Sequence, residues 1–173
     1  MRRSIFILAS FVLGLGFIAS GPARASAQEG QPLDLPCTTG VTVQPLGQGM
    51  PTDASGQVLV LVRITIAPGG GFAAHTHPGT LVVSIESGTF ELTQLNDMPM
   101  DVMRAASGST PAASEAMTKG VPVTLNPGDW FVEPKDMVHQ AFNRGTEPTV
   151  VVLAGLVDPT LPLVECVSGT PTS

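Results

Sequence analysis

Charged and aromatic side chains are scarce in this sequence. Of its 173 residues only 13% are charged and 5% are aromatic, with one tryptophan and no tyrosine. The chain contains no nucleophile elbow, phosphate-binding loop or zinc-finger spacing, so the motifs of several common hydrolase, nucleotide-binding and zinc-finger classes are missing. It is nevertheless 43% hydrophobic, which is enough to build a core and excludes wholesale disorder.

Basic residues number only eight, and three of them lie within the first 24 positions. Arg2 and Arg3 precede an apolar run over residues 5–19, and the small-residue stretch 23–27 follows it. This order is typical of a secretory signal peptide, so we expect residues 1–27 to form one that is cleaved near Ala27. A retained N-terminal anchor is the alternative, although the run is shorter than the roughly 20 residues that span a bilayer. The protein is therefore expected to be secreted or otherwise extracytoplasmic.

Removal of residues 1–27 would leave a strongly acidic protein. All 14 acidic residues and five basic residues remain, which gives a formal charge of −9. Such a chain repels phosphate backbones and anionic lipids, so we expect no nucleic-acid partner and no membrane partner after signal cleavage. The remaining 146 residues suit one domain that buries roughly 68–70% of its unfolded surface.

Only two cysteines are present, Cys37 and Cys166. In an exported protein we expect a disulfide between them, which would join the two ends of the mature chain. It would close a loop of about 130 residues and contribute about 5 kcal/mol on the chain-entropy account of disulfides. The alternative is two buried free thiols, because the compartment alone does not set the geometry of a bridge.

Short runs of β-branched and aromatic residues, separated by Gly, Pro, Asn and Asp, fill most of the remaining chain. They are typical of strands and turns, and no run shows a helical period with caps. The expected strands cover residues 58–66, 81–85, 89–95, 121–125, 130–132, 139–143 and 149–157. The second and third of these are expected to form a hairpin around Ser87-Gly88. Many short strands at regular spacing predict an all-β sandwich or barrel.

The same pattern divides the chain into a signal peptide (1–27), an N-terminal extension (28–40) and one β-barrel domain (41–168). Within that domain, residues 96–120 are small, polar and dotted with methionine. A stretch of this length is long for a loop, and such loops are usually functional lids or flexible excursions. We therefore expect residues 96–120 to be a flexible insertion.

The three histidines are the candidate functional residues. His75 and His77 follow a glycine-rich turn, and side chains at i and i+2 of an extended segment point to the same face. His139 comes 62 residues later, and inward side chains of different strands converge in a barrel. The two-histidine spacing is a weak signal because it also arises by chance. Spacing alone leaves a metal site and ordinary exposed histidines equally open.

Two segments resemble the paired motifs of the cupin superfamily. The first has the pattern Gly69-(five residues)-His75-Thr76-His77-Pro78-Gly79, with Gly88 after it. The second has the pattern Gly128-(five residues)-Pro134-Lys135-Asp136-(two residues)-His139-(three residues)-Asn143. Both are in the right order, and together they use every histidine of the chain. The resemblance implies a double-stranded jelly-roll β-barrel in which His75, His77 and His139 hold a metal ion.

Two positions depart from the cupin motifs. Leu81 stands where the first motif normally supplies a glutamate, and Asp136 stands where the second normally has glycine. Glu86 lies five residues beyond Leu81 and on the opposite face of an extended strand, so we do not expect it to replace the missing carboxylate. The resemblance thus implies three neutral imidazole ligands, which suit Zn, Fe, Ni or Cu better than Mn. Loss of metal binding altogether is the alternative.

The residues leave two functions open. The enzyme-rich superfamily implies a metal-dependent oxygenase, a related oxidoreductase or an isomerase that acts on a small molecule, as a single chain or a homodimer. A non-catalytic extracytoplasmic cupin that binds a small ligand or a metal is the alternative. This binding function is favoured by the missing carboxylate at Leu81 and by the absence of a clear acid–base group. Asp129 and Glu133 lie at a strand–turn junction and are expected to be solvated. No catalytic or substrate-binding residue is assigned.

Overall fold

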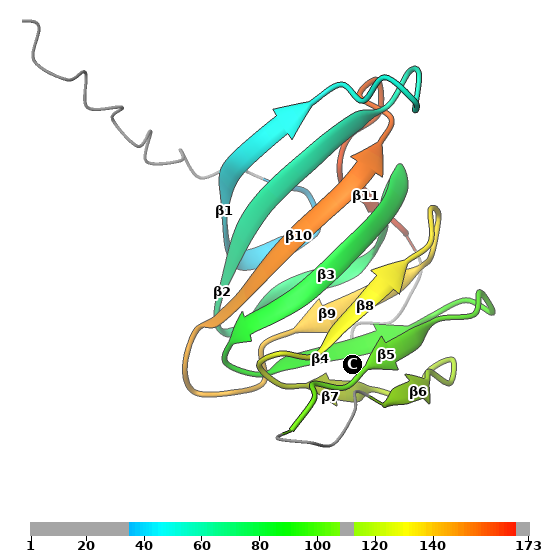
Figure 1. Cartoon of the computed structure of the whole chain (residues 1–173). Helices are drawn as coiled ribbons and strands as arrows, with labels where there is room; N and C mark the ends of the chain where they lie inside the picture. The colour runs from blue at the N-terminus through cyan, green and yellow to red at the C-terminus, as the bar shows by residue number, and fades with distance from the viewer. Residues whose placement is uncertain (1–34, 108–112, 169–173) are drawn as a thin grey trace, which may run out of the picture.

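The computed structural model describes residues 35–107 and 113–168 (Figure 1). The predicted signal peptide, residues 1–27, and residues 28–34 of the predicted extension lie outside the described residues. Within these two ranges every regular element is a β-strand, which confirms the all-β fold class. A search of the same ranges finds no helix with the length and apolar character needed to cross a membrane.

The strands cover the runs that the sequence predicts to be extended. In chain order they are β1 (Thr38–Gly49), β2 (Val58–Thr76), β3 (Gly79–Ser87), β4 (Phe90–Gln94), β5 (Asp101–Met103), β6 (Ser114–Ala116), β7 (Val123–Leu125), β8 (Trp130–Glu133), β9 (His139–Phe142), β10 (Thr149–Val157) and β11 (Glu165–Cys166). Each predicted run overlaps one of them, whereas β1, β5, β6 and β11 were not predicted.

All the strands belong to one antiparallel sheet that curls back on itself. Its order is β6-β5-β8-β3-β10-β2-β9-β4-β7, and both β1 and β11 pair with β2 outside this path. Figure 1 shows β1, β2, β10 and β3 running side by side, with β9, β4 and β7 curling beneath them. The curled sheet encloses an interior and is the barrel-type fold that the two motifs imply.

β2 belongs to both parts of the curled sheet because it bends in the middle. Residues 58–66 pair with β10, whereas residues 71–76 pair with β9 and β11. The bend lies at residues 68–71, where Gly69 has a φ of 73°, a conformation that glycine adopts without strain. A Cβ on Gly71 would overlap the carbonyl oxygen of Ala141. The glycine run, interpreted from the sequence as a strand end, is therefore a bend that carries the same strand on to His75.

The predicted hairpin around Ser87-Gly88 is wrong. β3 and β4 are joined there, with Gly88 at a φ of 76°, but the two strands do not pair with each other. β3 pairs with β10 on one edge and β8 on the other, while β4 pairs with β9 and β7. Both edges of β3 are thus occupied by distant strands, so the chain crosses to the other part of the sheet.

Two unpredicted strands lie in the predicted insertion, residues 96–120. β5 pairs with β6 and with β8, so this segment extends the sheet beyond β8. Ser114–Ala116, which the sequence assigns to a flexible insertion, is one of these strands. Residues 108–112 lie outside the described residues.

Asp129 is buried, which contradicts the expectation that it is solvated. The residue is 4% exposed, and its carboxylate accepts hydrogen bonds from the N–H groups of Ala105 and Asn126 and from Arg104 Nη1, at 2.8–3.0 Å. Arg104 also pairs with Glu115 on β6 at 2.6 Å. Asp129 therefore fastens the β5–β6 pair to the turn before β8.

The expected disulfide is present. Cys37 and Cys166 are bonded, with their Cα atoms 5.8 Å apart and a sequence separation of 129. The bond joins the residue before β1 to β11, and both strands pair with β2. The first and last strands of the domain are therefore fixed to each other across the same central strand.

Candidate metal centre

The strand pairing brings the three histidines together. His75 lies near the end of β2, His77 follows two residues later, and His139 begins β9 directly opposite His75. All three side chains are buried, and one ligand atom from each lies within 4.8 Å of the others. The three residues named from the sequence thus form a single buried cluster that could hold a metal ion.

Backbone carbonyl oxygens orient the three imidazoles. Nδ1 of His75 lies 2.7 Å from the carbonyl oxygen of Ala73, and Nδ1 of His77 lies 2.6 Å from that of Leu163. Nδ1 of His139 lies 3.3 Å from the carbonyl oxygen of Met137. A carbonyl oxygen only accepts, so in each of these contacts Nδ1 carries the proton and donates it. The three Nε2 atoms then keep their lone pairs, which is the form that binds a metal.

The spacing of two of these lone pairs fits a shared ion. Nε2 of His75 and Nε2 of His77 lie 3.2 Å apart, and two lone pairs at that distance repel each other when nothing positive lies between them. Two imidazole nitrogens that bind one ion at 2.0–2.1 Å with tetrahedral to octahedral angles lie roughly 2.9–3.4 Å apart. The donors therefore fit a divalent transition metal, and imidazole alone does not fix its identity.

Burial keeps the imidazoles neutral. It lowers the pKa of His75 to about 3, with the neighbouring His77 adding to the effect, and lowers the pKa of His77 to about 4. Burial likewise lowers the pKa of His139 well below its ordinary value of 6.5. A histidine must be neutral to coordinate a metal, so at neutral pH the cluster is in the form that binds one.

A buried carboxyl group adjoins the cluster, so the expectation that Glu133 is solvated is also wrong. Glu133 is 1% exposed, and its Oε1 lies 3.4 Å from His139 Nδ1 and 3.8 Å from His77 Nε2. That oxygen has no hydrogen-bond partner among the described residues. Burial raises the pKa of Glu133 well above its ordinary value of 4.5. Alternate residues of β8 point inward, and Glu133 does so together with the buried Phe131.

The histidines and Glu133 line a small internal cavity. The centres of water molecules could occupy about 40 Å³ inside it. One water molecule needs roughly 10–15 Å³ measured in this way. The walls are mainly apolar and come from both parts of the sheet, with contributions from Leu35, Val43, Val62, Ile64, Phe72, Val83, Phe90, Phe131, Ala141, Val151, Leu153, Leu163 and Val164. The cavity can therefore take an ion together with a ligand of few atoms.

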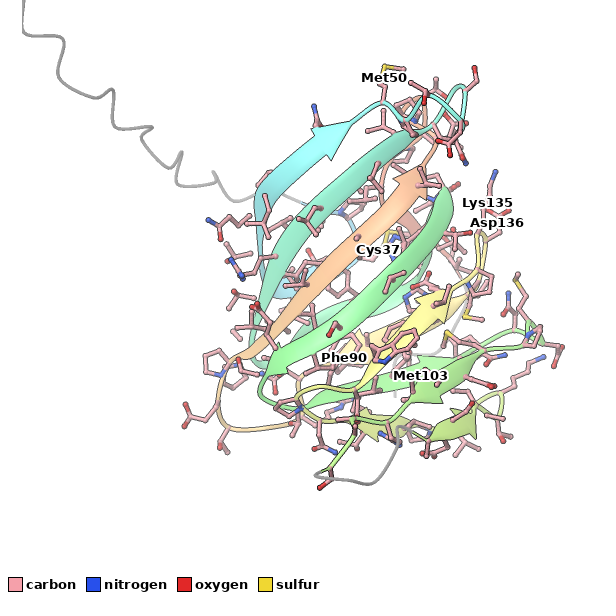
Figure 2. All side chains as sticks on the ribbon, viewed as in Figure 1. Cys37, Met50, Phe90, Met103, Lys135 and Asp136 are labelled. Atoms are coloured by element: carbon pink, nitrogen blue, oxygen red, sulfur yellow. A yellow bond between two sulfur atoms is a disulfide. The ribbon has the colours of Figure 1, made fainter. Side chains whose placement is uncertain are left out.

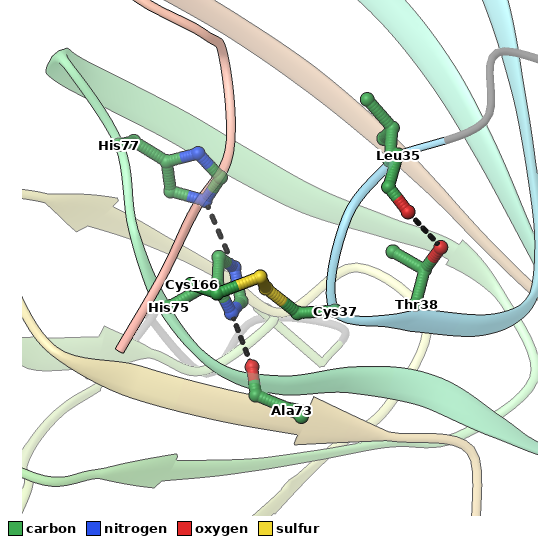
Figure 3. Close-up of a disulfide and its surroundings, with 7 residues drawn as sticks. All are labelled: Leu35, Cys37, Thr38, Ala73, His75, His77 and Cys166. Carbon is green, nitrogen blue, oxygen red and sulfur yellow. Dashed lines mark hydrogen bonds between the residues drawn. A yellow bond between two sulfur atoms is a disulfide. The ribbon is translucent and has the colours of Figure 1, made fainter. Parts of the chain in front are cut away.

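Residues 161–168, here called the C-terminal strap, contribute Leu163 and Val164 to the lining of this cavity. Its strand β11 places Cys166 opposite His75, and Leu163 supplies the carbonyl oxygen that accepts from His77. Figure 3 shows the disulfide from Cys37 to Cys166 beside the two histidines. The disulfide thus fixes the strap at the edge of the metal centre.

Asp136, the residue in place of a motif glycine, keeps the turn that glycine would make. Its φ is 65°, in the left-handed region that favours glycine and that aspartate adopts more readily than most residues. Its N–H donates to the carbonyl oxygen of His77 at 3.2 Å. Asp136 lies in the turn between β8 and β9 (Figure 2), so the backbone there has a glycine-like conformation although the residue is aspartate.

Leu81, the residue in place of a motif glutamate, faces the interior. It is fully buried, and it lies directly opposite Glu133 on β8 and Gly155 on β10. A Cβ on Gly155 would overlap Leu81 Cδ2, so the leucine side chain leans over the glycine. Glu86 is exposed and pairs with Arg63 at 2.9 Å, which confirms that it does not reach the centre.

The sequence model of the cupin family matches residues 51–160. This range holds both histidine motifs and Glu133, and it covers more than half of the chain. The chain therefore belongs to the cupin family.

Several proteins share parts of this sequence or fold. Germin-like protein 1-1 of Oryza sativa subsp. japonica is 32% identical over 95 residues, which cover 54% of this chain and 35% of that protein, so the chain spans about a third of its length. A cupin-like protein from Thermotoga maritima has a TM-score of 0.49 and 16% identity over 75% of this chain and 78% of that one. An RmlC-like cupin from Shewanella frigidimarina has a TM-score of 0.45 and 19% identity, covering 69% and 78%.

Sequence reasoning missed Glu133 and Leu163. A signal for Glu133 was available, because it stands two positions after Phe131 in one strand, and parity places both on the same face. Leu163 contributes its backbone carbonyl oxygen, and every residue has one, so no sequence pattern could have marked it.

Proposed function

We propose that this protein is an exported, metal-dependent cupin enzyme that acts on a small organic molecule, as an oxygenase, a related oxidoreductase or an isomerase. The observation that carries the proposal is the convergence of three buried, neutral imidazoles on one wall of a largely apolar cavity. Membership of the cupin family supports the same class. The disulfide is compatible with export, because such bonds persist in oxidising compartments.

In this proposal the Nε2 atoms of His75, His77 and His139 hold a divalent transition metal. When bound, such an ion polarises an oxygen atom of the substrate or activates dioxygen. The carbonyl oxygens of Ala73 and Leu163 hold the Nδ1 protons of His75 and His77 at 2.7 and 2.6 Å, which keeps each ring in its ligating orientation. The protein thus presents the donors already arranged.

The cavity walls set the kind of ligand. Phe72, Phe90 and Phe131 line the space together with aliphatic residues, so they exclude water and favour an apolar part of a ligand. The small volume admits only a few atoms beside an ion while the C-terminal strap is in place. The substrate class is therefore a small, mainly apolar molecule with one metal-binding oxygen.

A non-catalytic cupin that holds a small ligand or a metal is the second candidate. The observation that favours it is the fixed position of the C-terminal strap beside the site, because the strap is held by a disulfide and accepts a hydrogen bond from His77. A segment fixed in this way suits retention better than rapid turnover. The two functions differ in whether a bound small molecule is released chemically changed.

Metal analysis of the purified protein, followed by oxygen-uptake and product assays on small substrates, tests the proposal. We expect one divalent ion per chain and turnover that disappears in His139→Ala. Metal binding with no turnover on any substrate panel would leave the binding function. Absence of metal would contradict the enzyme and leave only a cupin that binds a small ligand without metal. Intact mass from the native host tests export, and the expected mature chain begins at or near Gln28.

A further inference from the structure

Among the described residues that line the cavity, Glu133 is the one with an acidic side chain. Its Oε1 is buried, has no hydrogen-bond partner within the described ranges, and lies 3.4 and 3.8 Å from nitrogens of His139 and His77. A buried carboxyl oxygen without a partner is costly, because it has lost the hydrogen bonds of water and gained none. The three-histidine centre by itself gives this oxygen no role.

Charge supplies the first argument for such a role. Three neutral imidazoles around a divalent ion leave two positive charges inside an apolar cavity, and buried charges in proteins are paired. The other residues that line the cavity are histidines and apolar side chains. Glu133 is therefore the compensating anion that the described residues place at the cluster.

Geometry supplies the second argument. The Nδ1 proton of His139 is directed to the carbonyl oxygen of Met137 at 3.3 Å, and the approach of Glu133 to the same nitrogen does not make a hydrogen bond. The nearby Nε2 of His77 carries a lone pair, since its Nδ1 donates to Leu163. The Glu133 oxygen lies 3.8 Å from that nitrogen, which is too long for a hydrogen bond but is a separation that two ligand atoms of one ion can have.

Strand register supplies the third argument. Glu133 and Leu81 are direct neighbours across β8 and β3, so each can present a side chain to the same part of the interior. Leu81 leans the other way, over Gly155 of β10. Glu133 is therefore the member of the pair that lines the cavity.

We propose that Glu133 is the fourth protein ligand of the metal ion and shifts the preference of the centre toward harder divalent ions such as Mn²⁺ and Fe²⁺. The inference rests on the proposed function in one respect, namely that the three histidines bind an ion. It reverses the metal preference expected for three imidazoles alone, because carboxylate oxygen is a harder ligand than imidazole nitrogen.

The test compares Mn²⁺ and Cu²⁺ affinities of metal-free wild-type protein, Glu133→Leu and Glu133→Gln. We expect Glu133→Leu to bind Mn²⁺ roughly 100-fold or more weakly than the wild type does. Its loss of Cu²⁺ affinity should be smaller than its loss of Mn²⁺ affinity by at least a factor of ten. The Mn²⁺ affinity of Glu133→Gln should lie between that of the wild type and that of Glu133→Leu, because the amide oxygen of glutamine is a neutral ligand atom. Glu86→Gln, which removes an exposed acid outside the cavity, is the matched control and should leave both affinities unchanged.

A ligand transplant makes the test specific to position. Because Leu81 and Glu133 face each other in register, Leu81→Glu combined with Glu133→Leu moves one carboxylate across the strand pair at nearly constant composition. We expect this double variant to recover Mn²⁺ binding to within about tenfold of the wild type. A variant that folds, binds Cu²⁺ and yet recovers no Mn²⁺ affinity would count against direct ligation by Glu133.

Thermal melts separate a ligand from a residue that only supports His139. Glu133→Leu should raise the melting temperature of the metal-free protein, because it removes an unpaired buried acid, and should shrink the rise caused by Mn²⁺. A lower metal-free melting temperature with equal losses for both ions would overturn the assignment in favour of a supporting role. If the wild type binds neither ion, the proposed function fails and the assignment with it. If the wild type binds both ions and Glu133→Leu keeps the same ratio of Mn²⁺ to Cu²⁺ affinity, only the assignment of Glu133 as a ligand fails.

Discussion

Cys166 lies directly opposite His75 in the pairing of β11 with β2. The disulfide from Cys166 therefore ends on the strand position that faces a candidate metal ligand. Two further contacts hold the C-terminal strap there, the N–H of Val167 donating to Ala74 O at 2.9 Å and Nδ1 of His77 donating to Leu163 O. The disulfide, the strap and the histidines are thus neighbouring parts of one arrangement.

Removal of the disulfide should loosen the strap and open the metal centre. In Cys37→Ser/Cys166→Ser we expect a loss of about 2–5 kcal/mol in the free energy of unfolding and faster release of bound metal to a chelator. Urea unfolding and the rate of chelator-induced release measure the two effects. Reduction of the wild-type protein should reproduce both, and an unchanged release rate would show that the strap does not limit access.

His139→Ala should abolish metal binding as completely as replacement of His75 and His77 together. All three nitrogens belong to one cluster within 4.8 Å, so the loss of any one imidazole breaks the ligand set of the same ion, with or without Glu133 as a further ligand. Metal content after gel filtration is the measurement. His139→Ala protein that retains one ion per chain would mean that the second motif does not coordinate.

Metal-free protein should lose stability as the pH falls from about 6.5 to about 4. Burial lowers the pKa of His75 to about 3 and that of His77 to about 4, against 6.5 for an unburied histidine. Between these pKa values the histidines of the unfolded chain bind protons that those of the folded chain do not. Their contribution to the free energy of unfolding is therefore full above pH 6.5 and declines below it. Urea unfolding at several pH values measures the slope. His75→Gln/His77→Gln should flatten it, and an identical slope in that variant would contradict the assignment.

Asp129→Asn should destabilise the fold without touching the metal centre. Its carboxylate is buried and accepts three hydrogen bonds from Ala105, Asn126 and Arg104, so we expect a loss of about 1–3 kcal/mol. Asp97→Asn is the matched control, because that side chain is 83% exposed and pairs only with Lys119; a surface pair is worth about 0–1 kcal/mol. Equal losses in the two variants, or altered metal stoichiometry in Asp129→Asn, would refute this account.

The sequence predicted the strands that form clear runs of β-branched and aromatic residues between turn residues. β10 is such a run and matches its predicted range of residues 149–157, with alternate side chains buried. β5, β6 and β11 have only two or three residues each, too few to show a period. The false hairpin at Ser87-Gly88 has another cause, because a turn signal is local whereas the choice of strand partner depends on strands far away in the sequence.

The candidate site was predictable as far as the motifs reach. His75, His77 and His139 were named from spacing and family resemblance, and the register of β2 with β9 explains why they meet. Glu133 was assigned to solvent because it stands beside a turn. Position along the chain proved a weaker guide than strand parity, since β8 continues its inward and outward alternation up to its last residue.

The 5.8 Å between the Cα atoms of Cys37 and Cys166 makes the chain between them almost a closed ring. A ring of this kind can be opened at a different exposed loop and rejoined at its original ends with a short linker, because closely spaced ends favour circular permutation. For the same reason the whole domain can be inserted into a loop of another protein without separating the two ends of that loop. The disulfide beside the metal centre thus also keeps the two ends of the domain close enough for circular permutation or insertion.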